Sequence, residues 1–95
     1  MTEALRRRRV RFVVSGFVQG VGFRWFVREE AASRGLTGFV RNCPDGTVRG
    51  EAEGERALLE EFLESLRRGP SAARVDGVEI QEIPCTHRKG FRIEF

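Results

Sequence analysis

Apolar and polar residues alternate in the first part of the chain. Val10, Phe12 and Val14 are separated from one another by arginine or valine, and this period of two predicts a half-buried strand over residues 9–15. A glycine-rich segment, residues 16–22, interrupts the alternation directly afterwards. The start of the chain therefore predicts a strand that ends in a loop.

Two later segments carry apolar residues at helical spacing. The first follows the glycine-rich loop and ends before Gly35, and its apolar residues are Phe23, Phe26, Val27 and Ala31. The second stops at Gly69 and Pro70, and its stripe consists of Leu58, Leu59, Phe62, Leu63 and Leu66. A stripe closed by glycine is typical of an amphipathic helix that packs one face on a core.

The remaining segments have strand character. Residues 36–43 and 47–53 flank the sequence Pro44-Asp45-Gly46, which is strong turn chemistry, so these two segments predict a hairpin. Strand patterns also occupy residues 75–83 and the last few residues, where Phe91, Ile93 and Phe95 alternate with polar residues.

The order of these elements is β-α-β-β-α-β followed by a short terminal strand. It predicts an α+β ferredoxin-like fold, the split β-α-β plan, with both helices on one face of an antiparallel sheet. A chain of 95 residues without a linker or a repeat is expected to form one domain. Since this plan supports many activities, including RNA binding, the fold alone does not indicate the function.

Charge is unevenly distributed although the net charge is only +3. Arginines crowd the start, at positions 6, 7, 8, 9 and 11, whereas residues 51–64 are acidic. We expect a solvated basic arm over residues 1–8 that leads into a domain over residues 9–95. A contact between this arm and a polyanion is the alternative. The chain has neither a bilayer-spanning apolar run nor an evident signal peptide, so a cytoplasmic location is expected.

The cysteines and the histidine do not predict a metal site. Cys43 and Cys85 lack the paired spacing of zinc ligands, and His87 is the single histidine. We expect free thiols, a solvated His87 and no cofactor, while a catalytic Cys43–His87 pair is a weak alternative.

The glycine-rich loop is the strongest candidate for chemistry. Glycines between a strand and a helix allow several N–H groups to point at one anion, which the positive end of the helix also attracts. The spacing differs from a Walker A loop, and Trp25 stands where the dinucleotide fingerprint has its third glycine. Arg24 could grip phosphate oxygens with its planar donors. A tight turn without a ligand, beside an ordinary surface arginine, remains the alternative.

Two motifs carry a resemblance to a known family. Gly16 to Arg24 reads G-F-V-Q-G-V-G-F-R, and Gly38 to Gly46 reads G-F-V-R-N-C-P-D-G. Both are similar to the signatures of the acylphosphatase family, in the same order, and Gly90-Phe91 resembles the opening of the family's last strand. The resemblance extends from about Val10 to Phe95. It implies hydrolysis of the carboxyl–phosphate anhydride of a small-molecule acyl phosphate, without a metal or cofactor.

The resemblance also implies roles for individual residues. Arg24 would clamp the phosphate, and Asn42 would orient the attacking water. Because an amide is no strong base, the phosphate of the substrate would receive the proton. The backbone of the loop would bind the phosphate through Gly16, Phe17, Val18, Gln19, Gly20, Val21 and Gly22.

Some residues in and around the motifs are expected to have no chemical role. Phe17 and Cys43 depart from the usual residues at the rim of the site, and the side chain of Gln19 receives no role. Asp45 is expected to serve the turn. The aromatic residues at the start of the first helix, Phe23, Trp25 and Phe26, are expected in the core or in a pocket wall.

Two other readings remain. An RNA- or polyanion-binding module would display aromatic residues on the open sheet face, but we expect Phe12, Phe39, Phe91 and Phe95 to share one buried face, so nucleic acid is an unexpected partner. The chain also resembles the acylphosphatase-like domain of hydrogenase maturation factors. We expect a monomer.

Overall fold

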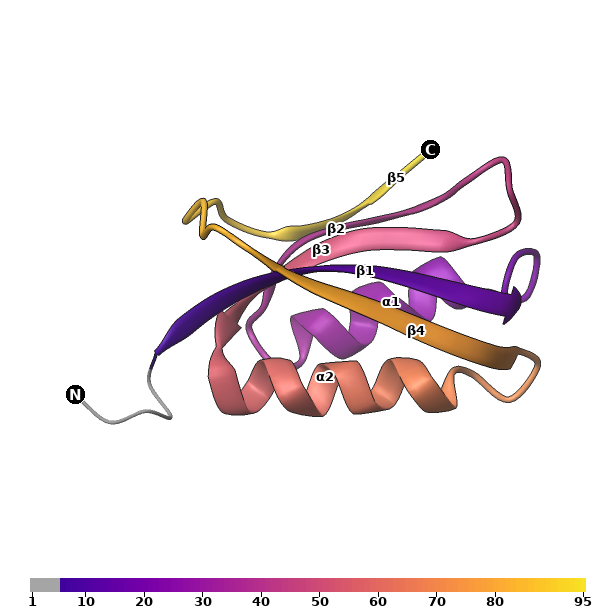
Figure 1. Ribbon diagram of the computed structural model, residues 1–95, viewed down its shortest axis with the longest axis horizontal. Helices are drawn as coiled ribbons and strands as arrows, with labels where there is room; N and C mark the ends of the chain where they lie inside the picture. Colours follow the sequence, from indigo (N-terminus) through magenta and orange to yellow (C-terminus); the bar gives the residue numbers. More distant parts are fainter. Residues whose placement is uncertain (1–5) are drawn as a thin grey trace.

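The computed structural model describes residues 6–95, which form five strands and two helices (Figure 1). The strands and helices follow one another in the order that the sequence predicts. In chain order they are β1 Arg7–Phe17, α1 Phe23–Ala32, β2 Thr37–Asn42, β3 Val48–Glu55, α2 Arg56–Arg68, β4 Arg74–Ile83 and β5 Phe91–Glu94. None of the helices within residues 6–95 is long and apolar enough to cross a bilayer.

The strands form one sheet in the order β4-β1-β3-β2-β5, and both helices cover the same face of it (Figure 1). This confirms the ferredoxin-like fold. The prediction of an antiparallel sheet is correct for β4, β1, β3 and β2, whereas β5 runs parallel to β2. The segment after β4 carries the chain to the opposite edge of the sheet, where the N–H of Gly38 donates to the carbonyl of Gly90.

The first strand begins earlier than the sequence predicts. The sequence predicts Arg7 and Arg8 in a basic arm over residues 1–8, but they are the first residues of β1 and pair with Glu55 and Gly54 of β3. Residues 1–5 of that arm lie outside the described part of the chain. Arg9, the first residue of the strand that the sequence predicts, is only 4% exposed.

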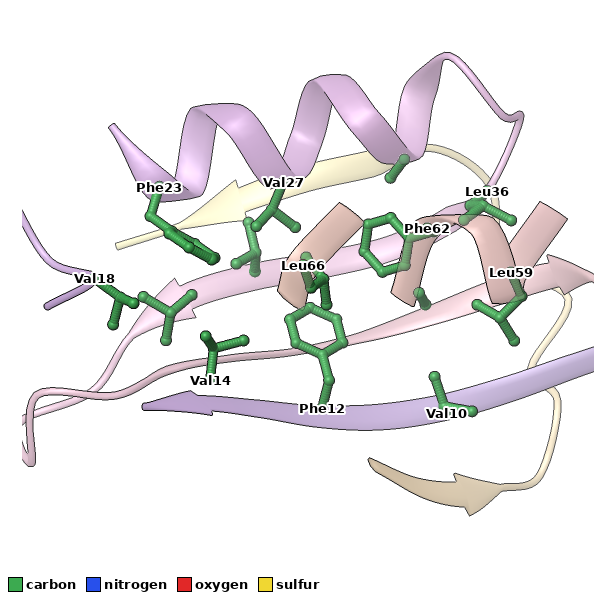
Figure 2. Close-up of a cluster of buried hydrophobic side chains, with 14 residues drawn as sticks. Val10, Phe12, Val14, Val18, Phe23, Val27, Leu36, Leu59, Phe62 and Leu66 are labelled. Atoms are coloured by element: carbon green, nitrogen blue, oxygen red, sulfur yellow. The ribbon is translucent and has the colours of Figure 1, made fainter. Parts of the chain in front are cut away.

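The core lies between the helices and one face of the sheet (Figure 2). Phe12 of β1 meets Phe62 of α2 edge-to-face, with 5.7 Å between the ring centroids. Gly50 of β3 makes room for this pair, because a Cβ at that position would lie 2.7 Å from Cζ of Phe12 and would overlap the carbonyl oxygen of Phe39. Phe23 and Val27 of α1 complete the apolar contact (Figure 2).

A buried carboxylate, Glu53 of β3, joins three segments on the other face of the sheet. Its oxygens accept hydrogen bonds from Nη1 of Arg9 at 3.0 Å and from Nη2 of Arg7 at 3.2 Å. They also accept the backbone N–H groups of Thr86 at 2.9 Å and His87 at 3.1 Å. Glu53 therefore fixes both the start of β1 and the segment that carries the chain to β5.

The environment of Glu53 stabilises its charged form. Burial raises the pKa of the carboxyl, but the hydrogen bonds from Thr86, His87, Arg9 and Arg7 outweigh burial and lower the pKa from 4.5 to about 2. The folded state therefore favours the ionised form of Glu53 over the protonated form. Stability from this group is present above about pH 4.5 and is lost as the pH falls towards 2.

We predict that Glu53→Gln lowers the free energy of unfolding at pH 7 by about 3 kcal/mol, because Arg9 then remains buried without its full counter-charge. Between pH 4.5 and 2 the variant should also lose less stability than the wild type. Urea unfolding followed by far-UV circular dichroism across this pH range measures both effects.

Glu82→Gln is the matched control for this variant. Glu82 is exposed and lies 3.6 Å from Nε of Arg8, so its loss should change the free energy of unfolding by less than about 1 kcal/mol. Equal stability and equal pH dependence of Glu53→Gln and the wild type would contradict the assignment of Glu53 as the anchor.

Candidate active site

The pairing of three strands brings the two sequence motifs to one end of the sheet. Val14, near the end of β1, lies opposite Val48 of β3, and Val48 lies opposite Asn42, the last residue of β2. The glycine-rich loop after β1 and the β2–β3 turn therefore lie at the same end of the molecule (Figure 1). The candidate site is built where these two connections meet.

Left-handed glycines shape the loop. Gly20 has φ 75°, and Gly22, which precedes the first residue of α1, has φ 76° and ψ 20°. Residues other than glycine rarely adopt this backbone conformation. The carbonyl of Gly22 accepts the N–H of Phe26 at 3.0 Å and so begins α1. Within residues 6–95, the N–H groups of residues 18–22 donate to no carbonyl or side-chain oxygen, which leaves them available for an anion.

Arg24 supplies a positive charge at the same place. It is the second residue of α1, whose first turn contains no acidic residue, and it forms no ion pair with residues 6–95. Its guanidinium carbon lies 4.9 Å from the centre of the Phe95 ring, a distance at which a cation and an aromatic face attract each other. The charge is therefore held in place without being neutralised.

Asn42 presents an unused acceptor. Its Oδ1 is buried and accepts no hydrogen bond from the described residues. Nearly all buried polar atoms in folded proteins have a partner, so this unpaired amide oxygen indicates that water or a ligand supplies the missing donor.

A pocket of about 180 Å³ joins these groups. Of the residues to which the sequence assigns roles, those that line it are Val18, Gly20, Gly22, Arg24 and Asn42. The others lie outside the lining. Gly16 belongs to β1 at an irregularity of its pairing with β4, Phe17 is 55% exposed, and Val21 packs against the core.

Gln19 also lies outside the lining, and sequence reasoning missed the role of its side chain. Nε2 of Gln19 donates to the carbonyl oxygens of Cys43 at 2.8 Å and of Thr47 at 3.0 Å. Both acceptors belong to the connection that follows Asn42. The amide thus ties the glycine-rich loop to the β2–β3 turn, a link between segments distant in sequence that no local pattern could indicate.

The β2–β3 turn is rigid in its own right, as the sequence predicts for Asp45. Oδ1 of Asp45 accepts the hydroxyl of Thr47 at 2.6 Å and the N–H of Thr47 at 3.0 Å, and Oδ2 accepts Nη2 of Arg49 at 2.7 Å. The hydrogen bonds from Thr47, and then those from Arg49, lower the pKa of Asp45 to about 2. The turn therefore holds its shape around neutral pH.

Two of the aromatic residues depart from the expected buried face. Phe39 alternates with the buried Val40 and so points to the open face of the sheet, where the guanidinium carbon of Arg92 lies 5.5 Å from the centre of its ring. Phe95 lies beyond the end of β5 and is fully exposed beside Arg24. In contrast, Phe12 and Phe91 both contact Phe62 in the core.

The remaining candidates do not assemble into a second site. Cys43 and Cys85 are both free thiols, and burial, followed by the charge of Glu53, raises the pKa of Cys85. The side chain of His87 is 71% exposed. Among residues 6–95, no group of three or more histidine, cysteine, aspartate or glutamate side chains is placed to hold a metal ion.

Comparison with known proteins identifies relatives of the whole domain. A family model described as acylphosphatase matches residues 10–93. A protein named acylphosphatase from Koribacter versatilis is 50% identical over 95 residues, which cover 99% of this chain and 84% of the relative.

Solved structures agree with this match. An acylphosphatase from Coxiella burnetii superposes with a TM-score of 0.89 at 39% identity, with 93% of each chain covered. Full-length HypF, in its phosphate- and nucleotide-bound form, matches 95% of this chain with a TM-score of 0.85 at 29% identity, but only 12% of HypF is covered. The family model and the similarity over the full domain show that this chain belongs to the acylphosphatase family.

Proposed function

We propose that the chain hydrolyses the carboxyl–phosphate anhydride of small-molecule acyl phosphates in the pocket between the glycine-rich loop and Asn42. The N–H groups of residues 18–22 bind the phosphate oxygens, and the guanidinium of Arg24 compensates their charge. Oδ1 of Asn42 accepts a hydrogen bond from the attacking water. The observation that carries this proposal is that Asn42, whose Oδ1 is buried and unpaired, lines the same pocket as Arg24.

The reaction requires little covalent help from the protein. The water oxygen forms a bond to phosphorus while the bond between phosphorus and the carboxylate oxygen breaks, so a carboxylate leaves. The proton lost by the water passes to a phosphate oxygen, since no side chain in the lining is a strong base. Positioning and charge stabilisation then supply the catalysis, as is typical of phosphoryl transfer.

Three further expectations belong to this proposal. The enzyme acts without a metal ion, it acts as a monomer, and it acts in the cytoplasm. The first has the most direct test, because a reaction that depends only on the loop, Arg24 and Asn42 is insensitive to a chelator.

We predict that Arg24→Ala and Asn42→Ala each lower kcat/KM for benzoyl phosphate by on the order of 10²-fold or more, because each removes a group that acts on the transition state. Wild-type activity should be unchanged in about 5 mM EDTA, because this chelator removes divalent ions from protein sites. Release of phosphate measured in the presence and absence of EDTA tests both statements.

Arg28→Ala and Arg41→Ala are matched controls for these variants. Arg28 lies on the same helix and pairs with Glu29 at 3.4 Å. Arg41 precedes Asn42 but is exposed and does not line the pocket. Both should retain wild-type activity. Folded Arg24→Ala and Asn42→Ala variants with wild-type rates would contradict the assigned roles.

A separate prediction concerns Gln19, which we propose as a positioning residue. Gln19→Met keeps the length of the side chain but removes the hydrogen bonds to Cys43 and Thr47. We expect kcat to fall by about 10-fold while KM changes little, because the loop backbone still binds phosphate and Asn42 loses its fixed position. Gln19→Glu should not restore kcat, since a carboxylate cannot donate to these carbonyls. A rise in KM at constant kcat would contradict this role.

A further inference from the structure

Two large apolar side chains are exposed at the mouth of the pocket. Trp25 is 59% exposed and Phe95 is fully exposed, yet both line the pocket beside Arg24 and Asn42. Trp25 also falls outside the buried stripe of α1, which consists of Phe23, Val27 and Ala31. Neither residue belongs to the buried core cluster. Burial in the core therefore does not account for the position of these two rings, and exposed apolar surface at a pocket indicates a ligand contact.

The size of the pocket separates the two parts of the substrate. A closed cavity of about 150 Å³ binds one benzene molecule, and the pocket here has a similar volume of about 180 Å³. A phosphate group at its polar end therefore leaves little enclosed space for a large acyl group. The glycine-rich loop and Arg24 attract the phosphate to the polar part. The acyl group must then lie across the rim, where Trp25 and Phe95 supply the apolar surface.

The charge of the lining restricts the acyl group further. Arg24 has the only charged side chain in the described lining of the pocket, and the phosphate engages it. No second cation is left there to recognise a carboxylate on the acyl group. Phe95 is held against Arg24 with 4.9 Å between the guanidinium carbon and the ring centre, which keeps one aromatic surface fixed at the rim.

We propose that Trp25 and Phe95 form an acyl-binding subsite that selects acyl phosphates with an aromatic or other bulky uncharged acyl group over those with a small one. An aromatic acyl group packs against the two rings, whereas an acetyl group does not reach them. This inference rests on the proposed function for the reaction that follows binding. It adds the class of acyl group that the enzyme prefers. It assigns this preference to Trp25, which has no part in the proposed phosphate binding or in the positioning of the water.

The test compares benzoyl phosphate with acetyl phosphate in the wild type and in Trp25→Ala. The variant should lose about 3- to 10-fold in kcat/KM for benzoyl phosphate, the range expected for one aromatic pair, and should keep its value for acetyl phosphate. Trp25→Phe should restore most of the loss. Ile80→Ala is the matched control, because Ile80 is also an exposed large apolar side chain, at 39%, but lies outside the pocket lining.

Binding of phosphonates, which the enzyme cannot hydrolyse, tests the subsite independently of the proposed reaction. Trp25 is the single tryptophan of the chain, so its fluorescence reports directly on ligands at the rim. Benzylphosphonate should change this fluorescence and bind several-fold more tightly than methylphosphonate, and calorimetry should show that Trp25→Ala removes the difference.

The outcomes separate the two claims. Wild-type protein that hydrolyses neither acyl phosphate would overturn the proposed function, and the two phosphonates would still decide the subsite. An active wild type in which Trp25→Ala affects both acyl phosphates equally, or neither, would overturn the subsite and leave the proposed function standing. Equal affinity for the two phosphonates would also overturn the subsite.

Discussion

The antiparallel pairing of β1, β3 and β2 is the constraint on which the rest of the molecule depends. Val14, Val48 and Asn42 lie side by side across these strands, so the connections at this end of the sheet meet. A shift of one residue in this register would turn Asn42 to the other face of the sheet and would expose Phe12. The site therefore inherits its geometry from the packing of the core.

The two ends of the β1–β3 strand pair have different structural roles. Near the start of β1, Arg9 and Arg7 bind the buried Glu53, which also fixes the segment leading to β5. Beyond the end of β1, left-handed glycines and Gln19 shape the loop and join it to the β2–β3 turn. A rigid frame of this kind supports the proposal that one arginine and one amide suffice, since the alignment of reacting groups contributes much of the catalysis in enzymes.

Local patterns predicted the elements, their order and the two motifs, because alternation, helical stripes and turn residues act over short stretches of chain. They did not predict contacts across the sheet. The arginines of β1 and the acidic residues of β3 were read as separate charged segments, whereas pairing places Arg9 opposite Glu53 and Arg11 opposite Glu51. Phe39 and the side chain of Gln19 were misjudged or passed over for the same reason, since their surroundings come from other strands and loops.

The central claim is that the loop backbone, Arg24 and Asn42 form one phosphate site. Titration of ¹⁵N-labelled protein with inorganic phosphate, followed by amide NMR spectra, tests it directly. The largest shifts should occur at the N–H groups of residues 18–22 and at the side-chain amide of Asn42, and they should saturate together. Shifts concentrated instead on the arginines of β1, with the loop unchanged, would contradict the account.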